Sequence, residues 1–268
     1  MADTRHPDEA KAKVRVQFGD NAAAYATSAP HAHGASLPRL VELARPQADW
    51  RVLDVATGAG HTALAFAPYV AEVVATDLTP EMLAVAAGLA RDRGLANVTF
   101  APADAEDLPF GDGAFDLVTC RIAAHHFPDV GRFLAEAARV LRPGGVLGLV
   151  DNVVPDDPVA AAFVNAFEAR RDPSHVRCLP LAAWAGALAD AGFAVTHAES
   201  AAKAILFATW IANMAVPAET AALLREMLAS APPPAAAFLR PTETEDGLVF
   251  HLAEGLVIGR KAGPQPHV

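Results

Sequence analysis

The chain has 268 residues, and its 21 Lys and Arg against 31 Asp and Glu give a formal net charge of −10. No basic stripe interrupts this acidity, so the sequence disfavours nucleic acid and anionic membranes as partners. The charged N-terminus lacks the apolar run of a secretory signal, and the longest uncharged apolar stretch, residues 204–218, is shorter than the roughly 20 residues of a membrane-spanning helix. Together with the small number of cysteines, Cys120 and Cys178, these features predict a soluble cytoplasmic protein.

The predicted elements begin with helical residues 8–45, broken around 28–36 by proline, glycine and histidine. From residue 50 to 151, short β-branched runs alternate with alanine-rich helical periodicity, which predicts βαβ units and a parallel sheet. Strands are expected at 51–55, 72–77, 98–101, 115–120 and 146–151, and helices at 61–69, 80–93 and 130–141. Downstream we expect helices at 157–170 and 181–191, a strand at 193–199, one or two helices within 206–230, a proline-rich break at 232–234 and a last strand at 248–261.

A glycine-containing turn joins the first predicted strand to the helix after it. Gly58 and Gly60 let the backbone approach a ligand closely, and Asp77 ends the next strand, where a carboxylate can accept hydrogen bonds from both hydroxyls of a ribose. This combination indicates an adenosine-type ligand. Asp54, just before the loop, would face a pyrophosphate unfavourably, and this argues against NAD and for a cationic ligand.

Several further motifs follow the loop in the order seen in a known family. The full set is Asp54-x-Ala56-x-Gly58-x-Gly60, Asp77, DAEDLPF at 104–110, FDLV at 115–118 and RVLRPGG at 139–145. In this order the chain resembles the class I S-adenosylmethionine-dependent methyltransferases, and more closely their type 11 group, which includes ubiquinone and menaquinone biosynthesis enzymes. Ala56 departs from the family pattern, which usually has glycine at that place.

The resemblance implies a fold and a division of the chain. The fold would be α/β, with a doubly wound, mostly parallel seven-stranded sheet, an antiparallel last strand and a helical cap. The divisions would be an N-terminal helical lid (1–48), an S-adenosylmethionine-binding core (49–200), a helical cap insertion (201–236) and a final strand that completes the sheet (237–268).

The resemblance also implies roles around the cofactor. The loop would hold the methionine moiety, and its residues are Asp54, Ala56, Thr57, Gly58 and Gly60. Asp77 would hold the ribose hydroxyls, and Leu78 would pack on the adenine face. The Asp104 carboxylate and the Ala105 amide would bind the adenine edge.

Two more side chains are candidates at this site. Arg121 follows the fourth strand and would pair with the carboxylate of the cofactor; a solvated cation at a helix start is the alternative. Tyr25 would close over the cofactor from the N-terminal lid, and packing against the sheet is its ordinary alternative.

Methyl transfer from a sulfonium is an in-line displacement, so the protein must align donor and acceptor and remove a proton from a hydroxyl, an amine or an acidic carbon. Histidine suits this proton transfer at neutral pH. The candidates are His125, His126 and His175, with His31 and His33 in the N-terminal segment. We expect at most one of the adjacent His125 and His126 to face the cofactor. Asp151 ends the fifth strand at the same sheet edge and is a further candidate for contact with the acceptor.

An apolar stripe recurs near helical spacing in the expected cap, at Phe207, Trp210, Ile211 and Met214. Such a stripe is more often core or dimer contact than the wall of a substrate site; if it caps the site, it favours an apolar or aromatic acceptor.

The sequence therefore predicts a methyltransferase that uses S-adenosylmethionine, without a metal, to methylate O, N or C of a small apolar or aromatic metabolite as a monomer or homodimer. Two alternatives stay open: an NAD-dependent oxidoreductase, and a protein that binds S-adenosylmethionine without methyl transfer.

Overall fold

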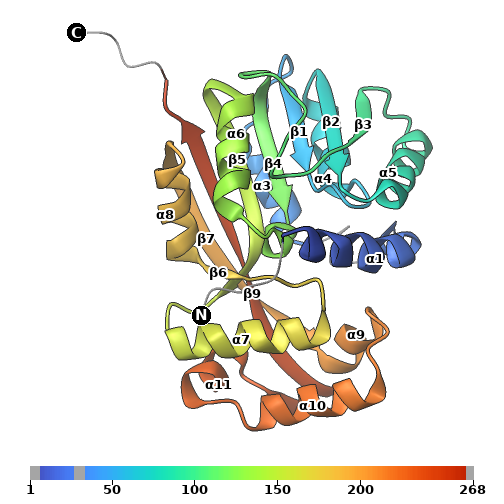
Figure 1. The fold of residues 1–268 in the computed structure, drawn as a ribbon, viewed down its shortest axis with the longest axis vertical. Coiled ribbons are helices and arrows are strands. Elements are labelled where there is room, and N and C mark those ends of the chain that lie inside the picture. Colours follow the sequence, from blue (N-terminus) through green and yellow to red (C-terminus); the bar gives the residue numbers. More distant parts are fainter. Residues whose placement is uncertain (1–6, 27–33, 264–268) are drawn as a thin grey trace.

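The computed structural model describes residues 7–26 and 34–263 (Figure 1). Within them a nine-stranded sheet has the main strand order β3-β2-β1-β4-β5-β9-β7. These strands are β1 (Arg51–Val55), β2 (Glu72–Asp77), β3 (Val98–Pro102), β4 (Phe115–Arg121), β5 (Leu141–Val154), β7 (Phe193–Leu206) and β9 (Gly247–Lys261). Two short strands lie off this path, β6 (Leu179–Pro180) beside β5 and β8 (Thr242–Thr244) beside β9.

The pairing of the strands confirms the doubly wound fold. β1 is parallel to β2 and β4, β2 to β3, and β4 to β5, whereas β9 is antiparallel to both β5 and β7. The chain runs outward from β1 through β2 to β3 and then returns to β4 on the other side of β1. Ligands of such sheets bind at this switch point, outside the carboxyl ends of the strands.

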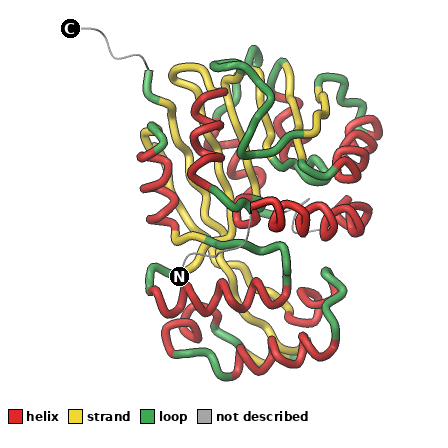
Figure 2. Tube along the Cα trace, in the orientation of Figure 1, coloured by secondary structure: helices red, strands yellow, loops and turns green. Residues whose placement is uncertain are grey.

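Helices cover both faces of the parallel part of the sheet (Figure 2). One face carries α3 (Ser36–Ala44), α4 (His61–Phe66) with the 3-10 turn η1 (Ala67–Tyr69), and α5 (Pro80–Asp92), and the other carries α6 (Val130–Val140) and α8 (Leu181–Asp190). Successive residues of a strand point to opposite faces of the sheet. In β1, Val52 packs in the hydrophobic cluster that contains Leu40, and Leu53 packs in the cluster that contains Phe133. Burial on both faces explains the continuous apolar runs of the strands.

A helical lobe surrounds the lower ends of β7 and β9 (Figures 1 and 2). Its helices are α7 (Pro158–Arg171), α9 (Phe207–Ala212), α10 (Ala218–Ala229) and α11 (Pro233–Leu239). The lobe has its own core, in which the rings of Phe167 and Trp210 stack at 4.9 Å between centroids and Phe250 lies 5.0 Å from Trp210. Phe207 and Trp210 of the apolar stripe are therefore core residues of this lobe.

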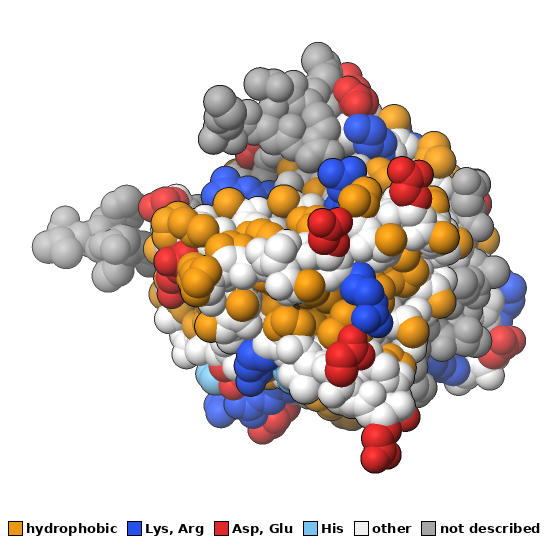
Figure 3. Space-filling view, turned by 90° about the horizontal axis from the view of Figure 1, so that it is seen from below, with side chains coloured by type: hydrophobic (Ala, Val, Ile, Leu, Met, Phe, Trp, Pro, Cys, Tyr) orange, Lys and Arg blue, Asp and Glu red, His pale blue; other side chains and the backbone are white. Residues whose placement is uncertain are grey.

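The outer face of the lobe mixes hydrophobic and charged side chains (Figure 3). Val159 on α7 and Leu223 on α10 are apolar residues exposed on these helices, with 56% and 41% of their surface accessible. Among residues 7–26 and 34–263, no helix combines the length and the apolar character needed to cross a membrane.

The structure differs from the sequence prediction mainly in the alanine-rich segments. β7 continues to Leu206, so residues 201–206, expected at the start of the helical insertion, are strand paired with β9. β5 likewise begins at Leu141 and ends at Val154, beyond the predicted 146–151. The expected break at 232–234 instead starts α11, with Pro233 in its first turn, where a missing N–H costs nothing. Cross-strand pairing outweighed the helical preference of alanine in β7.

Candidate active site

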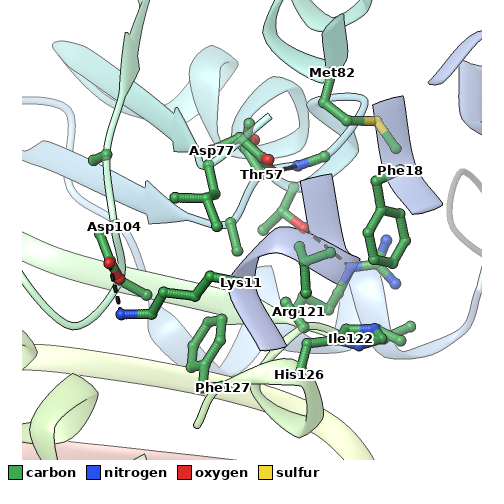
Figure 4. A pocket seen from close by; sticks show the side chains of 18 of the residues that line it. Lys11, Phe18, Thr57, Asp77, Met82, Asp104, Arg121, Ile122, His126 and Phe127 are labelled. Atoms are coloured by element: carbon green, nitrogen blue, oxygen red, sulfur yellow. Dashed lines mark hydrogen bonds and ion pairs between the residues drawn. The ribbon is translucent and has the colours of Figure 1, made fainter. Parts of the chain in front are cut away.

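A cavity opens at the carboxyl ends of β1, β2 and β4, next to the helix α1 (Pro7–Ala26) (Figure 4). The empty space in and around it, including solvent at its mouth, is about 960 Å³. Its walls come from α1, the turn after β1, the end of β2 and the segments that follow β3 and β4. The sequence-predicted cofactor residues that line it are Ala56, Thr57, Gly58, Asp77, Leu78, Asp104, Ala105 and Arg121. Residues that are far apart in the sequence thus meet in one cavity at the switch point of the sheet.

The glycine loop is built from left-handed backbone. Ala56, Gly58 and Gly60 have φ values of 52°, 54° and 86°. Alanine tolerates such a φ at a cost of about 1–2 kcal/mol, so Ala56 can take this conformation without being glycine. Gly60 has a stricter requirement, because an added Cβ would lie 2.8 Å from the Cβ of Ala86 in α5.

Asp54 supports this loop from behind and does not line the cavity. Its carboxylate accepts hydrogen bonds from the hydroxyls of Thr57 and Thr119, both at 2.6 Å, and from the Ala63 N–H at 3.1 Å. Burial raises the pKa of Asp54 to about 6, against the opposing effect of these hydrogen bonds. Asp54 and Gly60 thus lie outside the lining of the cavity, and direct contact of either residue with a cofactor stays a prediction.

Asp77 joins the end of β2 to the glycine loop. Its carboxylate accepts from the Gly58 N–H at 2.8 Å and from the Thr79 N–H at 2.9 Å, and burial raises its pKa. The side chain is 8% exposed at the wall of the cavity. A carboxylate held by two backbone amides beside an opening is suited to bind the hydroxyls of a ligand.

Lys11 of α1 reaches into the same cavity (Figure 4). Its ammonium nitrogen lies 2.7 Å from an oxygen of Asp104 and 2.6 Å from an oxygen of Glu106. Burial lowers the pKa of Lys11, but the two carboxylates outweigh burial and raise it. The ion pairs fasten α1 over the opening, a contact that no local pattern in the sequence signalled. Tyr25 lies in the same helix, but its side chain is outside the described residues.

Arg121 ends β4 and is 8% exposed at the wall of the cavity. Its Nε donates to the Thr62 hydroxyl at 3.0 Å, and burial lowers its pKa. The next residue, Ile122, has a left-handed φ of 54°, and its N–H donates to the Val150 carbonyl at 2.7 Å. A β-branched residue in this region stores about 1–3 kcal/mol of strain, which is typical of binding sites.

The sequence-predicted catalytic residues form one buried cluster beside the cavity. His125 and His126 lie in the 3-10 turn η2 (Ala124–His126), with ring centroids 4.1 Å apart, and the His175 ring is 5.6 Å from His125. His126 lines the cavity, whereas His125, His175 and Asp151 do not. His31 and His33 lie outside the described residues.

The two adjacent histidines have opposite electrostatic surroundings. The His125 Nδ1 lies 2.5 Å from an oxygen of Asp151; burial lowers the pKa of His125, but this carboxylate raises it further than burial lowers it. Burial, with the charge of His125, lowers the pKa of His126 to about 4. His126 is therefore neutral at neutral pH, and this lowered pKa makes it a weaker base than an exposed histidine. Among the described residues, no three His, Cys, Asp or Glu side chains converge as ligands of a metal ion.

Apolar side chains surround His126 at its end of the cavity. Phe18 of α1 meets the His126 ring edge-on, with centroids 5.1 Å apart. Ile122 and Phe127 flank the same region, and Met82 of α5 lies near Phe18 (Figure 4). The sequence analysis did not predict that these residues line the cavity. Phe127 directly follows the predicted His125 and His126, but no local sequence pattern marks Phe18 or Met82 as residues of the site.

Comparison with known proteins shows a match to the methyltransferase domain model over residues 53–149. The chain is 43% identical over 202 residues to the uncharacterized methyltransferase YcgJ of Bacillus subtilis (strain 168). The aligned region covers 75% of this chain and 80% of the relative. The crystal structure of YcgJ has a TM-score of 0.82 at 39% identity, over 86% of this chain and 99% of that chain.

Two further methyltransferases resemble the chain, one in part of its sequence and the other in its fold. A demethylmenaquinone methyltransferase of Thermus thermophilus is 48% identical over 116 residues, or 42% of this chain and 52% of the relative. A geranyl diphosphate methyltransferase, solved in complex with S-adenosylmethionine, shares the fold with a TM-score of 0.60 at 17% identity, over 85% of each chain.

Proposed function

The chain belongs to the class I S-adenosylmethionine-dependent methyltransferases, in their type 11 group, and from this membership we propose that it methylates O, N or C of a small apolar or aromatic metabolite with His126 as base. The observation that carries the proposal is the lining of a single cavity. One part of the lining holds the glycine loop and the acidic residues suited to an adenosine-type ligand, and another part holds the neutral His126 among apolar side chains. The N-terminal helix would be its lid.

The residues on the cavity wall fit the cofactor. The Asp77 carboxylate would hold the ribose hydroxyls. The Asp104 carboxylate and the Ala105 amide would bind the adenine edge, and the adenine would then replace Lys11 as the partner of Asp104. Leu78 would pack on the adenine face. The methionine end would lie along the loop, at Ala56, Thr57 and Gly58, with Arg121 near its carboxylate.

S-adenosylmethionine supplies the activated methyl group on its sulfonium, so the chain need not activate the donor. His126 would remove the proton that a hydroxyl, amine or acidic carbon loses as it is methylated, a contribution of typically 10²–10⁴-fold to the rate. Phe18, Ile122 and Phe127 would exclude water from this end of the cavity and favour an apolar acceptor.

The alternatives are less well supported. The oxidoreductase is not favoured, because the relatives and the matching family model are methyltransferases. A protein that binds the cofactor without methyl transfer would keep the same cavity and lack turnover with any acceptor. We further propose a cytoplasmic monomer or homodimer, and the buried free thiols of Cys120 and Cys178 are consistent with a reducing compartment.

The first test is calorimetric titration with S-adenosylmethionine, S-adenosylhomocysteine and NAD. We expect micromolar binding of the first two, and Asp77→Ala to weaken it by about 100-fold or more, because hydrogen bonds to a charged group are lost. Gly58 and Thr79 donate to different oxygens of Asp77, so Asp77→Asn keeps the size of the side chain and an acceptor for one of the two amides. The matched control is Asp112→Ala, whose side chain is 82% exposed. Binding of NAD alone contradicts the proposal.

The second test follows transfer of a labelled methyl group to a panel of phenols, quinols, aromatic amines and acidic carbon compounds. His126→Gln is expected to keep the affinity for S-adenosylhomocysteine and to lower transfer by about 10²–10⁴-fold. Full transfer in this variant would exclude His126 as base. Binding of the cofactor without transfer to any acceptor favours the non-catalytic alternative.

A further inference from the structure

The loop that follows α7 is fastened to the turn that carries the histidines. The Val176 and Arg177 N–H groups both donate to the His125 carbonyl at 2.9 Å. Within the loop, one Asp172 carboxylate oxygen accepts from the Ser174 N–H at 2.8 Å and from the Ser174 hydroxyl at 2.5 Å. The side chains of Asp172 and Ser174 are both buried, although Pro173 between them is exposed.

The Nδ1 atom of His126 faces Ser174, which is not among the residues that line the cavity. It lies 3.1 Å from the Ser174 carbonyl oxygen and 3.2 Å from the Ser174 hydroxyl oxygen. A carbonyl oxygen only accepts, and the hydroxyl has already donated its hydrogen to Asp172, so both atoms require a donor on the ring. Nδ1 of His126 must therefore carry the proton, and Nε2 of the neutral ring is unprotonated.

We propose that Asp172 and Ser174 are positioning residues that hold His126 as its Nδ1–H tautomer and leave Nε2 as the atom that accepts the proton of the methyl acceptor. This inference rests on the proposed function, because it names the base atom of the same site. The arrangement repeats a general solution of enzymes, in which a base is oriented by a third group. Here the third group is a chain from the His126 N–H through the Ser174 hydroxyl to the Asp172 carboxylate.

The charges around the ring keep His126 neutral in the resting protein. His125, held by Asp151, lies on one side of the His126 ring, and its positive charge opposes protonation of His126. Asp172 lies behind Ser174 and partly compensates that charge, while Phe18 covers the ring edge from α1. The ring therefore stays neutral, and only the choice of tautomer decides which nitrogen can act as base.

The test measures the tautomer directly and needs no acceptor. Protein labelled with ¹⁵N-histidine is examined by long-range ¹H–¹⁵N correlation spectroscopy at pH 7.5, with His126 assigned by His126→Gln. We expect a protonated Nδ1 and an unprotonated Nε2 in the native chain. Asp172→Ala should lower the ratio of the Nδ1–H to the Nε2–H tautomer by about tenfold, the effect of losing a hydrogen bond of ordinary strength. Asp172→Asn keeps an acceptor oxygen and should restore the native ratio.

Asp157→Ala is the matched structural control. Asp157 caps the other end of α7, where its carboxylate accepts from the Val159 and Ala160 N–H groups. Its loss should destabilise the helix without moving the tautomer ratio. If Asp172→Ala does not fold, Ser174→Ala supplies the same measurement, with a smaller fall expected because this variant has no hydroxyl that could donate to Nδ1.

An Nε2–H tautomer in the native chain overturns the inference, and so does an unchanged ratio in folded Asp172→Ala and Ser174→Ala. Titration with S-adenosylhomocysteine on the same samples separates the two proposals. Failure to bind it refutes the proposed function, whereas normal binding with the wrong tautomer refutes only the positioning role of Asp172 and Ser174.

Discussion

Replacement of Gly60 by alanine tests the close contact between the glycine loop and α5. Gly60 has a φ of +86°, and an added Cβ would lie 2.8 Å from the Cβ and 3.3 Å from the Cα of Ala86. The left-handed backbone costs alanine about 1–2 kcal/mol. Overpacking against Ala86 costs about 1–3 kcal/mol more, because one of the opposing atoms belongs to the helix backbone. We therefore expect Gly60→Ala to lower the free energy of unfolding by about 2–5 kcal/mol.

The measurement is urea unfolding followed by circular dichroism, with two glycine controls. Gly58→Ala, at a φ of +54° with nothing within 4 Å of the added Cβ, should lose only the backbone contribution of about 1–2 kcal/mol. Gly186→Ala, within α8 and also without a neighbour for the Cβ, should gain up to about 1 kcal/mol. Equal losses for Gly60→Ala and Gly58→Ala would refute the argument from contact with Ala86.

Three further predictions concern the lid, the buried acid and the helical lobe. Lys11→Met should speed amide hydrogen exchange in α1 by about tenfold, because charge-assisted bonds to Asp104 and Glu106 are lost; unchanged exchange would contradict the fastening role. Asp54 has a pKa of about 6 in the folded chain, above its unfolded value. Protonated Asp54 therefore stabilises the fold below the unfolded pKa, and the free energy of unfolding falls by up to about 3 kcal/mol as the pH rises through 6. Urea midpoints from pH 4.5 to 7.5 should show this slope in the native chain and a flatter one in Asp54→Asn. Trp210→Ala should lower the free energy of unfolding by about 3–5 kcal/mol, because Trp210 lies in the core of the lobe. The affinity for S-adenosylhomocysteine should not change, since Trp210 does not line the cavity, and a weakened affinity would show that the lobe belongs to the site.

The part of the site that could be predicted from sequence consists of short local patterns. Gly58 lies in a turn directly after a buried strand, and Asp77 lies at the end of the next one. Parallel strands bring their carboxyl ends to one edge of the sheet, so these positions had to meet once the βαβ pattern was recognised. The family resemblance added Asp104 and Arg121 to this edge, and both line the cavity.

Orientation and long-range contacts required the tertiary structure. Asp54 belongs to the same motif as Gly58, but the hydroxyl of Thr119 on the neighbouring strand turned its carboxylate into the core. His125 and His126 are adjacent in sequence, and only the packing of the loop after α7 shows which of them borders the cavity. No period or spacing predicts that choice, because it depends on partners about fifty residues away.

The sequence by itself determined the fold class, the glycine loop and the acidic end of β2, because each of these is visible as a local pattern of residues. Only the tertiary structure decided that Lys11 meets Asp104 across 93 positions of the chain, that residues 201–206 are strand, and that Ser174 faces the ring of His126. These features arise from contacts between distant segments, whose energies outweigh local preference and leave no trace in local pattern.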